Sequence, residues 1–158
     1  MGNAHGVYIL HSAFCILNMY RRILVAVENS AADRTIVTHV RDLATLTGAE
    51  ILLVHVADGW AARNFDQLQL RESEEMKADR AYLDSLASEL RASSLKVTTE
   101  LAMGDPATEL IRLVEERQVD LIAMSTHGHR LFNDLLRGTT VNKVRHLVKI
   151  PVLLLRAQ

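Results

Sequence analysis

Residues 119–140 read VDLIAMSTHGHRLFNDLLRGTT: an apolar run, a loop that contains two glycines, and the beginning of a helix. The largely apolar run 119–124 predicts a strand. Gly128 lets the backbone approach a ligand closely or adopt a positive φ, and Gly138 does the same just before the helix. Ligands of open α/β sheets bind at the carboxyl ends of the strands, and the N–H groups at a helix N-terminus suit phosphate. The stretch therefore predicts a phosphate-binding loop.

The charges around this loop agree with a phosphate site. Between positions 130 and 149 the only acid is Asp134. The basic residues of the same segment are Arg130, Arg137, Lys143, Arg145 and Lys149. An ordinary solvated helix face is the alternative explanation for the last three of them. The whole chain has a formal net charge of −1 and a sequence pI of about 6.7, which indicates neither a nucleic-acid surface nor a membrane surface.

Segments of strand length alternate with segments of helical period along the chain. The expected strands cover residues 23–27, 51–56, 95–102, 119–124 and 151–155. Strands separated by helices imply a parallel sheet with right-handed crossovers, so we expect an α/β fold with helices on both faces of the sheet. The chain has 158 residues, of which 49% are apolar. We therefore expect one soluble domain over residues 19–158 and a loosely ordered extension over residues 1–18.

Several residues predict where the helices begin and end. Ser30–Asp33 resembles a capping box, and Gly48 predicts the end of the helix that follows it. Asp105 and Pro106 predict an N-cap and a proline at the first helical position. The last helix should begin at Thr139 and turn four apolar residues toward the core. These residues are Val141, Val144, Leu147 and Val148.

Two strands have patterns that bear on the edges of the sheet. Strand 95–102 alternates apolar and polar side chains, which is typical of an exposed edge strand. The last strand, Pro151–Leu155, is apolar on both faces, and an exposed apolar edge favours pairing with another chain. Two interpretations stay open for it: a second subunit covers the strand in a homodimer, or the strand lies inside the sheet of a monomer.

The loop spacing resembles that of one protein family. ATP-binding members of the universal stress protein family carry the pattern Gly-x2-Gly-x9-Gly-Ser/Thr after the fourth strand, and Ser125-x2-Gly128-x9-Gly138-Thr139 keeps each spacing. Further segments resemble the family in the expected order, over most of the chain from Met19. They are Tyr20–Val27, Leu53–Val56, Met103–Pro106 and Lys149–Leu155.

The resemblance implies both a fold and a function. The fold would be an open, doubly wound, five-stranded parallel sheet that is Rossmann-like (adenine nucleotide alpha-hydrolase-like), with strand order 3-2-1-4-5 and a crevice between strands 1 and 4. The function would be that of a cytoplasmic stress-response regulatory protein that binds ATP, ADP or AMP, with Mg²⁺ as a candidate companion. It would act as a homodimer through Pro151–Leu155 and on an unknown protein partner. The alternatives are a family member that binds no nucleotide and acts through protein contacts, and a weak ATPase.

The family's binding residues carry over to the ends of the first, second and fourth strands. Adenine contacts fall at Ala26, Val27, Glu28 and the backbone of Val56. The rest of the nucleotide site falls at Met124, Ser125, Gly128, His129, Gly138, Thr139 and Thr140. Two positions depart from the family pattern, because Ser125 replaces its first glycine and Glu28 replaces its usual aspartate. Serine fits where φ is negative, and the longer Glu28 still offers a carboxylate to an adenine amino group.

Little in the sequence indicates catalysis or a resident metal. There is no Ser/His/Asp arrangement in motif context, so enzymatic activity is uncertain and is at most slow ATP hydrolysis. His127 and His129 lack the further ligands that zinc needs, and Asp134 is either a Mg²⁺ candidate between phosphates or a solvated loop acid. His55, in an apolar strand, is expected to be a satisfied core histidine. Cys15 is the only cysteine, which excludes an internal disulfide and suits a reducing cytoplasm, and no apolar stretch is long enough to span a bilayer.

Overall fold

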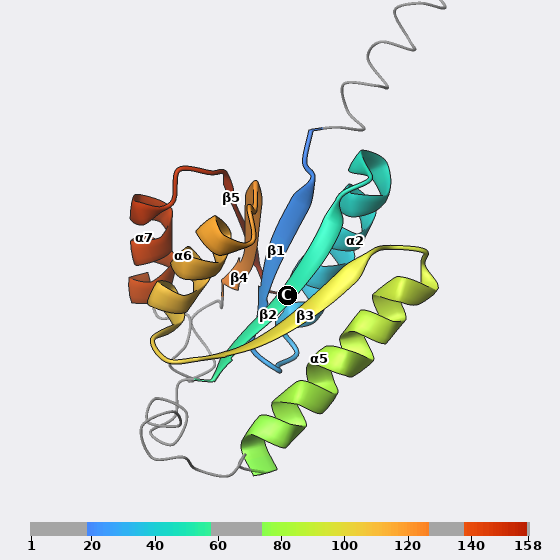
Figure 1. Ribbon diagram of the computed structural model, residues 1–158, viewed down its shortest axis with the longest axis horizontal. Coiled ribbons are helices and arrows are strands. Elements are labelled where there is room, and N and C mark those ends of the chain that lie inside the picture. The colour runs from blue at the N-terminus through green and yellow to red at the C-terminus, as the bar shows by residue number, and fades with distance from the viewer. Residues whose placement is uncertain (1–18, 58–73, 127–137, 158) are drawn as a thin grey trace, which may run out of the picture.

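The computed structural model describes residues 19–57, 74–126 and 138–157, which form one parallel sheet with helices on both faces (Figure 1). The elements are β1 (Arg22–Val27), α2 (Asp33–Thr47), β2 (Glu50–Ala57), α5 (Glu74–Ala92), β3 (Val97–Met103), α6 (Pro106–Glu116), β4 (Leu121–Thr126), α7 (Gly138–Leu147) and β5 (Val152–Arg156). The strands lie in the order β3-β2-β1-β4-β5. The predicted α/β class and strand order are therefore confirmed.

Strand β1 occupies the middle of the sheet and pairs in parallel with β2 on one edge and β4 on the other. Its side chains alternate between two cores. Ile23, Val25 and Val27 pack in the core formed with α2 and α5. Leu24 and Ala26 pack in the core formed with α6 and α7. Figure 1 shows these two helix pairs on opposite faces of the sheet, which explains why the strand is apolar throughout.

The outer strands are β3 and β5. In β3, Thr98 is exposed while Val97 and Ala102 are buried, which agrees with the predicted edge strand. In β5, the residues Val152–Leu155 are half-buried and pack alternately on the two cores. Strand β5 therefore lies at an edge with an apolar sequence, and not inside the sheet.

The helix ends follow the local sequence signals. Gly48 closes α2 in the left-handed conformation, with φ of 74°. Asp105 caps α6, because its carboxylate accepts a 3.0 Å hydrogen bond from the Thr108 N–H. At the start of α2, the Asp33 carboxylate accepts from the Ser30 N–H at 3.1 Å, but the N-cap is Ala32 and has no side-chain cap bond, so the predicted capping box is only half formed.

Helix α7 differs from the prediction in two respects. It begins at Gly138, one residue before Thr139. Leu147 was expected to face the core, but it is 63% exposed, so that prediction is wrong. The residues that do face the core are Val141, Val144 and Val148. Leu147 lies roughly a quarter turn around the helix from the centre of this stripe, which places it in solvent.

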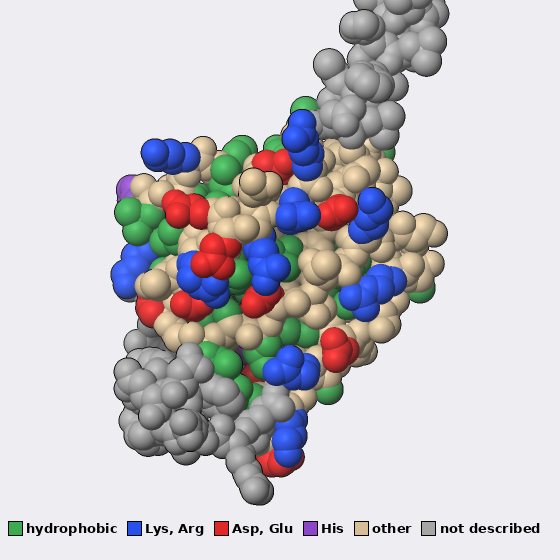
Figure 2. Space-filling view, in the orientation of Figure 1, with side chains coloured by type: hydrophobic (Ala, Val, Ile, Leu, Met, Phe, Trp, Pro, Cys, Tyr) green, Lys and Arg blue, Asp and Glu red, His purple; other side chains and the backbone are tan. Residues whose placement is uncertain are grey.

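The described surface carries charges of both signs. Figure 2 shows Lys and Arg side chains interspersed with Asp and Glu across the viewed face. Several of them form ion pairs, such as Arg112 with Glu109 at 2.7 Å and Arg117 with Glu100 at 2.6 Å. Among the helices that the structure describes, none is long and apolar enough to cross a membrane.

Candidate functional site

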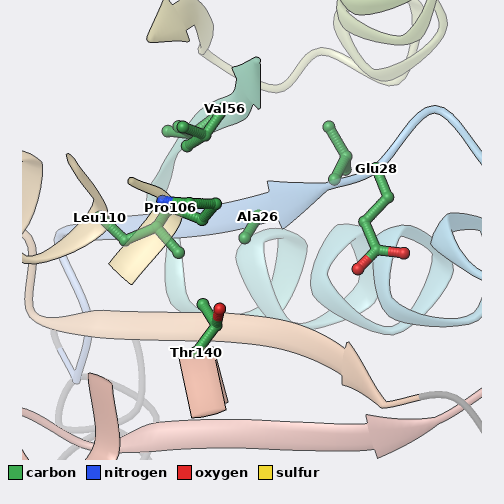
Figure 3. A pocket seen from close by; sticks show the side chains of 8 residues that line it. Ala26, Glu28, Val56, Pro106, Leu110 and Thr140 are labelled. Carbon is green, nitrogen blue, oxygen red and sulfur yellow. The ribbon is translucent and has the colours of Figure 1, made fainter. Parts of the chain in front are cut away.

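A pocket lies at the carboxyl ends of β1 and β2, beside the first turns of α6 and α7 (Figure 3). The space within it, part of which is open to solvent, is about 260 Å³. Its lining is mostly apolar and consists of Ala26, Val27, Glu28, Val54, Val56, Pro106, Leu110 and Thr140. The structure thus brings together Ala26, Val27, Glu28, Val56 and Thr140 from the predicted nucleotide site. The pocket borders the junction of β1 and β4, where strand order reverses and open sheets bind ligands.

The small side chain of Ala26 gives the pocket its room. Ala26 faces the α6 and α7 side of the sheet and is 8% exposed. Figure 3 shows Pro106 and Leu110 from α6, Val56 from β2 and Thr140 from α7 around it. Apolar walls with a few polar groups are typical of small-molecule sites, and this set suits a flat ring.

Glu28 supplies the acidic group of the pocket. It follows β1 directly, and its backbone N–H donates to both carboxylate oxygens of Asp33, each at 3.0 Å. Burial, followed by the negative charge of Asp33, raises the pKa of Glu28 to about 7. The group therefore changes its charge near neutral pH, which is unusual for a glutamate.

Asp33 holds the turn between β1 and α2 in place. Its side chain is buried, with 1% exposed. Besides the Glu28 N–H, the carboxylate accepts hydrogen bonds from the Ser30 N–H at 3.1 Å and the Tyr82 hydroxyl at 2.8 Å. Burial, and then the charge of Asp33, raises the pKa of Tyr82, so that this hydroxyl stays a donor. The turn that presents Glu28 is thereby fixed to α5 as well as to α2.

A second set of polar contacts fixes the same turn from the α5 side. Asn29 has a positive φ of 58° and donates from Nδ2 to Asp79 Oδ1 at 3.0 Å. Asp79 Oδ2 lies 3.3 Å from Nε2 of His55, whose Nδ1 is 2.9 Å from the Val27 carbonyl oxygen. The prediction that His55 is a satisfied core histidine is confirmed, because it is 7% exposed and both ring nitrogens have partners.

Asp79 and Tyr82 were not predicted as site residues. A signal for Asp79 was present in α5, where Met76, Asp79 and Leu83 share the buried face. A carboxylate at helical spacing between two core residues needs a buried partner. Only the fold shows that this partner comes from β2 and from the turn after β1.

Ser125, which replaces the first glycine of the family's loop pattern, makes a buried structural contact. It is part of β4, is 1% exposed, and donates from its hydroxyl to the Ala32 carbonyl oxygen at 2.9 Å. Its backbone is extended and its φ is not among the positive ones, so a side chain fits without strain. The hydroxyl is thus directed at the start of α2.

The other predicted site residues fall into three groups. Met124 is fully buried in the core beneath the pocket. Gly138 and Thr139 open α7, and Thr140 in the same turn reaches the pocket. The first N–H groups of a helix have no intrahelical partner and carry a partial positive charge, which favours an anion. Gly128, His129 and Asp134 lie outside the described residues.

Metal ligands do not gather in the described part of the chain. Over residues 19–57, 74–126 and 138–157, no three His, Cys, Asp or Glu side chains are placed to hold a metal ion. His39 and His146 are exposed on α2 and α7.

Comparisons with known proteins agree on one family. The family model described as the universal stress protein family matches residues 19–156. Universal stress protein MJ0577 from Methanocaldococcus jannaschii is 25% identical, over 87% of this chain and 96% of its own length. The solved structure of the hypothetical protein MJ0577 superposes with a TM-score of 0.69 and 25% identity, covering 89% of this chain and 98% of that one.

Two further structures share the fold at lower identity. A universal stress protein in complex with cAMP has a TM-score of 0.64 and 16% identity, covering 88% of this chain and 98% of that one. The universal stress protein from Archaeoglobus fulgidus in complex with dAMP has a TM-score of 0.63 and 18% identity, covering 85% and 97%. Since the family model spans nearly the whole described chain and the strand order is the expected one, this protein belongs to the universal stress protein family.

Proposed function

We propose that this protein is a stress-response regulatory module that binds an adenine nucleotide (ATP, ADP or AMP) in the pocket between β1, β2, α6 and α7. The observation that carries the proposal is the apolar pocket around Ala26, with Glu28 on its rim and the first turn of α7 opening onto it. Relatives of the same fold hold cAMP and dAMP, which supports an adenine ligand.

The base would lie against Ala26 and Val56, and the phosphates would extend toward the start of α7. There the N–H groups of Gly138, Thr139 and Thr140 lie in the first turn, where they have no intrahelical acceptor and would donate to phosphate oxygens. The sequence pattern adds the backbone around Gly128 and His129 to this phosphate site. Mg²⁺ would enter as a companion of the phosphates, with Asp134 as its candidate protein ligand.

A thermal-shift titration with ATP and Mg²⁺ tests this function. A ligand that binds only the folded state stabilises it by about 2.7 kcal/mol at a hundredfold excess over Kd. We expect a saturable rise in melting temperature with wild type and none with Gly128→Val, whose side chain would block the close approach of backbone to phosphate. An unchanged melting temperature at millimolar ATP, ADP and AMP would contradict the proposal.

The second candidate is a family member that binds no nucleotide and works through protein contacts. The serine at position 125 and the glutamate at position 28 favour it, since both depart from the family's binding pattern. The titration above separates the two functions. A slow ATP hydrolase is the enzymatic variant of the nucleotide-binding function. A steady-state rate of phosphate release at background would exclude this variant.

We also propose that two copies pair through β5. The strand lies at the sheet edge, and its residues Val152–Leu155 are half-buried although their side chains are apolar. An edge strand with free backbone groups and apolar side chains is a template for a second copy. Sedimentation at several concentrations should give the mass of a dimer; a monomer over the whole range would contradict the pairing.

A further inference from the structure

His55 is a buried histidine whose two ring nitrogens both face hydrogen-bond acceptors. Nδ1 lies 2.9 Å from the carbonyl oxygen of Val27, and Nε2 lies 3.3 Å from Oδ2 of Asp79. His55 and Asp79 are each 7% exposed. A neutral imidazole carries one N–H group, so it can donate to only one of these two acceptors. The arrangement therefore needs one more proton than a neutral histidine and an ionised aspartate supply.

That proton lies between Nε2 of His55 and Oδ2 of Asp79. Nδ1 must already carry a hydrogen, because a backbone carbonyl oxygen can only accept. The other carboxylate oxygen of Asp79, Oδ1, accepts a 3.0 Å hydrogen bond from Nδ2 of Asn29. Asp79 thus accepts on both oxygens, which suits a carboxylate opposite an imidazolium. Loss of the proton would turn a lone pair of Nε2 toward the carboxylate and would leave that buried oxygen without its donor.

The pair holds both ends of a three-residue segment at the pocket. Val27 ends β1 and lines the pocket, as does Glu28 after it. Asn29 completes the segment with a positive φ of 58°, a conformation that costs free energy for a residue other than glycine. His55 contacts the first residue of the segment through Nδ1, and Asp79 contacts the last through Oδ1. The shared proton joins these contacts into one chain that runs from β2 and α5 to the pocket wall.

Other ionisable groups lie around the same turn. They are Glu28 after β1, Asp33 on α2, and Tyr82 and Arg80 on α5. The carboxylate of Asp33 is committed to the Tyr82 hydroxyl and to backbone N–H groups, and Arg80 is exposed. On β3, the residue in register with His55 is the apolar Leu101. Within the described residues, the ring of His55 therefore makes its polar contacts to one carbonyl oxygen and one carboxylate.

We propose that His55 and Asp79 form a pH-dependent support of the pocket: the protonated pair positions residues 27–29 for the nucleotide, and loss of the proton releases them. Both are positioning residues, because they act through the Val27 carbonyl group and the Asn29 side chain and are not part of the pocket lining. The inference rests on the proposed nucleotide function and adds its control by pH. Nucleotide affinity should fall as the pH rises through the range in which histidine titrates.

Asp79→Asn is the matched variant, because its amide can supply the hydrogen that a neutral His55 lacks. The amide oxygen would accept from Asn29, and the amide nitrogen would donate to Nε2. Each of these contacts is then kept with a neutral ring, so the segment should stay in place at high pH. His55→Gln is a second variant, since its amide can donate to Asp79 without ionising.

Heteronuclear NMR of the free protein from about pH 5.5 to about pH 8.5 tests the protonation directly. In wild type we expect both ring nitrogens of His55 to carry hydrogen at the acidic end, and the side-chain amide signals of Asn29 to shift as one proton is lost. In Asp79→Asn, only Nδ1 should carry hydrogen, and the Asn29 signals should stay constant. One unchanged protonation state of His55 in wild type, or Asn29 signals that do not follow it, would overturn the inference whether or not a nucleotide binds.

Calorimetric ATP affinities of wild type and Asp79→Asn over the same pH range test the link to the pocket. Glu28, whose pKa burial raises to about 7, and the phosphates of ATP titrate with both proteins, so their effects cancel in the ratio of the two affinities. The ratio of wild-type to variant affinity should fall as the pH rises, by up to about tenfold per pH unit. A constant ratio would overturn the inference and leave the proposed function standing. Absence of ATP binding to both proteins at every pH would contradict the proposed function, and the NMR titration would still decide whether the pair supports the segment.

Discussion

The hydroxyl of Ser125 donates a 2.9 Å hydrogen bond to the carbonyl oxygen of Ala32, across 93 positions of the sequence. The bond ties the end of β4 to the start of α2, at the place where strand order reverses. In the family pattern this position is a glycine, and the side chain of a serine there could have pointed into the space that the phosphates would occupy. Instead its side chain is turned into the body of the protein.

Ser125→Ala should therefore lower stability and leave nucleotide affinity unchanged. The substitution removes a buried hydrogen bond, and we expect the free energy of unfolding to fall by about 1 kcal/mol. Urea denaturation measures it, with Ser85→Ala on the exposed side of α5 as the control that should change little. A large loss of ATP affinity at unchanged stability would show instead that the hydroxyl serves the ligand.

Asp33→Asn should destabilise the protein strongly. The carboxylate accepts from two backbone N–H groups and from Tyr82, and the amide would turn a donor toward one of them. Hydrogen bonds to a charged group contribute about 1.5–3 kcal/mol each, so we expect a loss of about 3 kcal/mol. Asp42→Asn, in the exposed part of the same helix, is the matched control. Equal stability of the two variants would contradict the role given to Asp33.

Asp79→Ala should also destabilise, because it leaves His55 and Asn29 without their shared acceptor. Removing one partner of a buried pair typically costs about 3 kcal/mol. Asp84→Ala lies on the exposed side of α5 and should be near neutral. Thermal unfolding of both variants decides the matter, and a stable Asp79→Ala would show that the contact carries little energy.

Glu28 should make stability depend on pH in a predictable direction. In the unfolded chain the carboxyl loses its proton near its ordinary pKa of 4.5, and in the folded state only near 7. The folded state thus binds the proton more tightly, so the contribution of Glu28 to stability is complete below about pH 4.5. It is lost as the pH rises toward about 7. Glu28→Gln should flatten this part of the stability profile; the same profile in both proteins would contradict it.

Ala26→Val should weaken nucleotide binding without unfolding the protein. The added methyl groups project into the pocket, where Pro106 and Leu110 already lie (Figure 3). We expect at least about a tenfold loss of ATP affinity, equal to roughly 1.4 kcal/mol, with little change in the melting temperature of the free protein. Unchanged affinity in a calorimetric titration would place the base elsewhere.

The strands and helix ends could be predicted because their signals are local. Residues 23–27 form an unbroken apolar run since β1 is buried on both faces, and Gly48 and Asp105 act through their own backbone or side chain. The order of the strands in the sheet, in contrast, could not be predicted from local signals. Periodicity shows which residues form strands but not which strands pair, so the order came from the family resemblance.

The polar contacts beneath the site could not be predicted, because they join distant residues. Tyr82 meets Asp33 across 49 positions, and Asn29 meets Asp79 across 50. These partners are set by how α5 packs on the sheet, which no local pattern encodes. The prediction for Leu147 is wrong for a related reason. Its spacing fits an apolar stripe along a helix, but the stripe of α7 that packs against the sheet is centred on other residues.

The central place of β1 has a consequence for how the chain folds as it is made. One edge of β1 pairs with β2, which ends 35 residues after the start of β1. The other edge pairs with β4 at Leu121–Thr126, which is synthesised much later. During synthesis the first two thirds of the chain can form β1, β2 and β3 with two helices, yet one edge of the apolar strand β1 stays unpaired. A ribosome-bound chain of which about the first 110 residues have emerged should therefore bind chaperones, and release should follow once β4 has emerged.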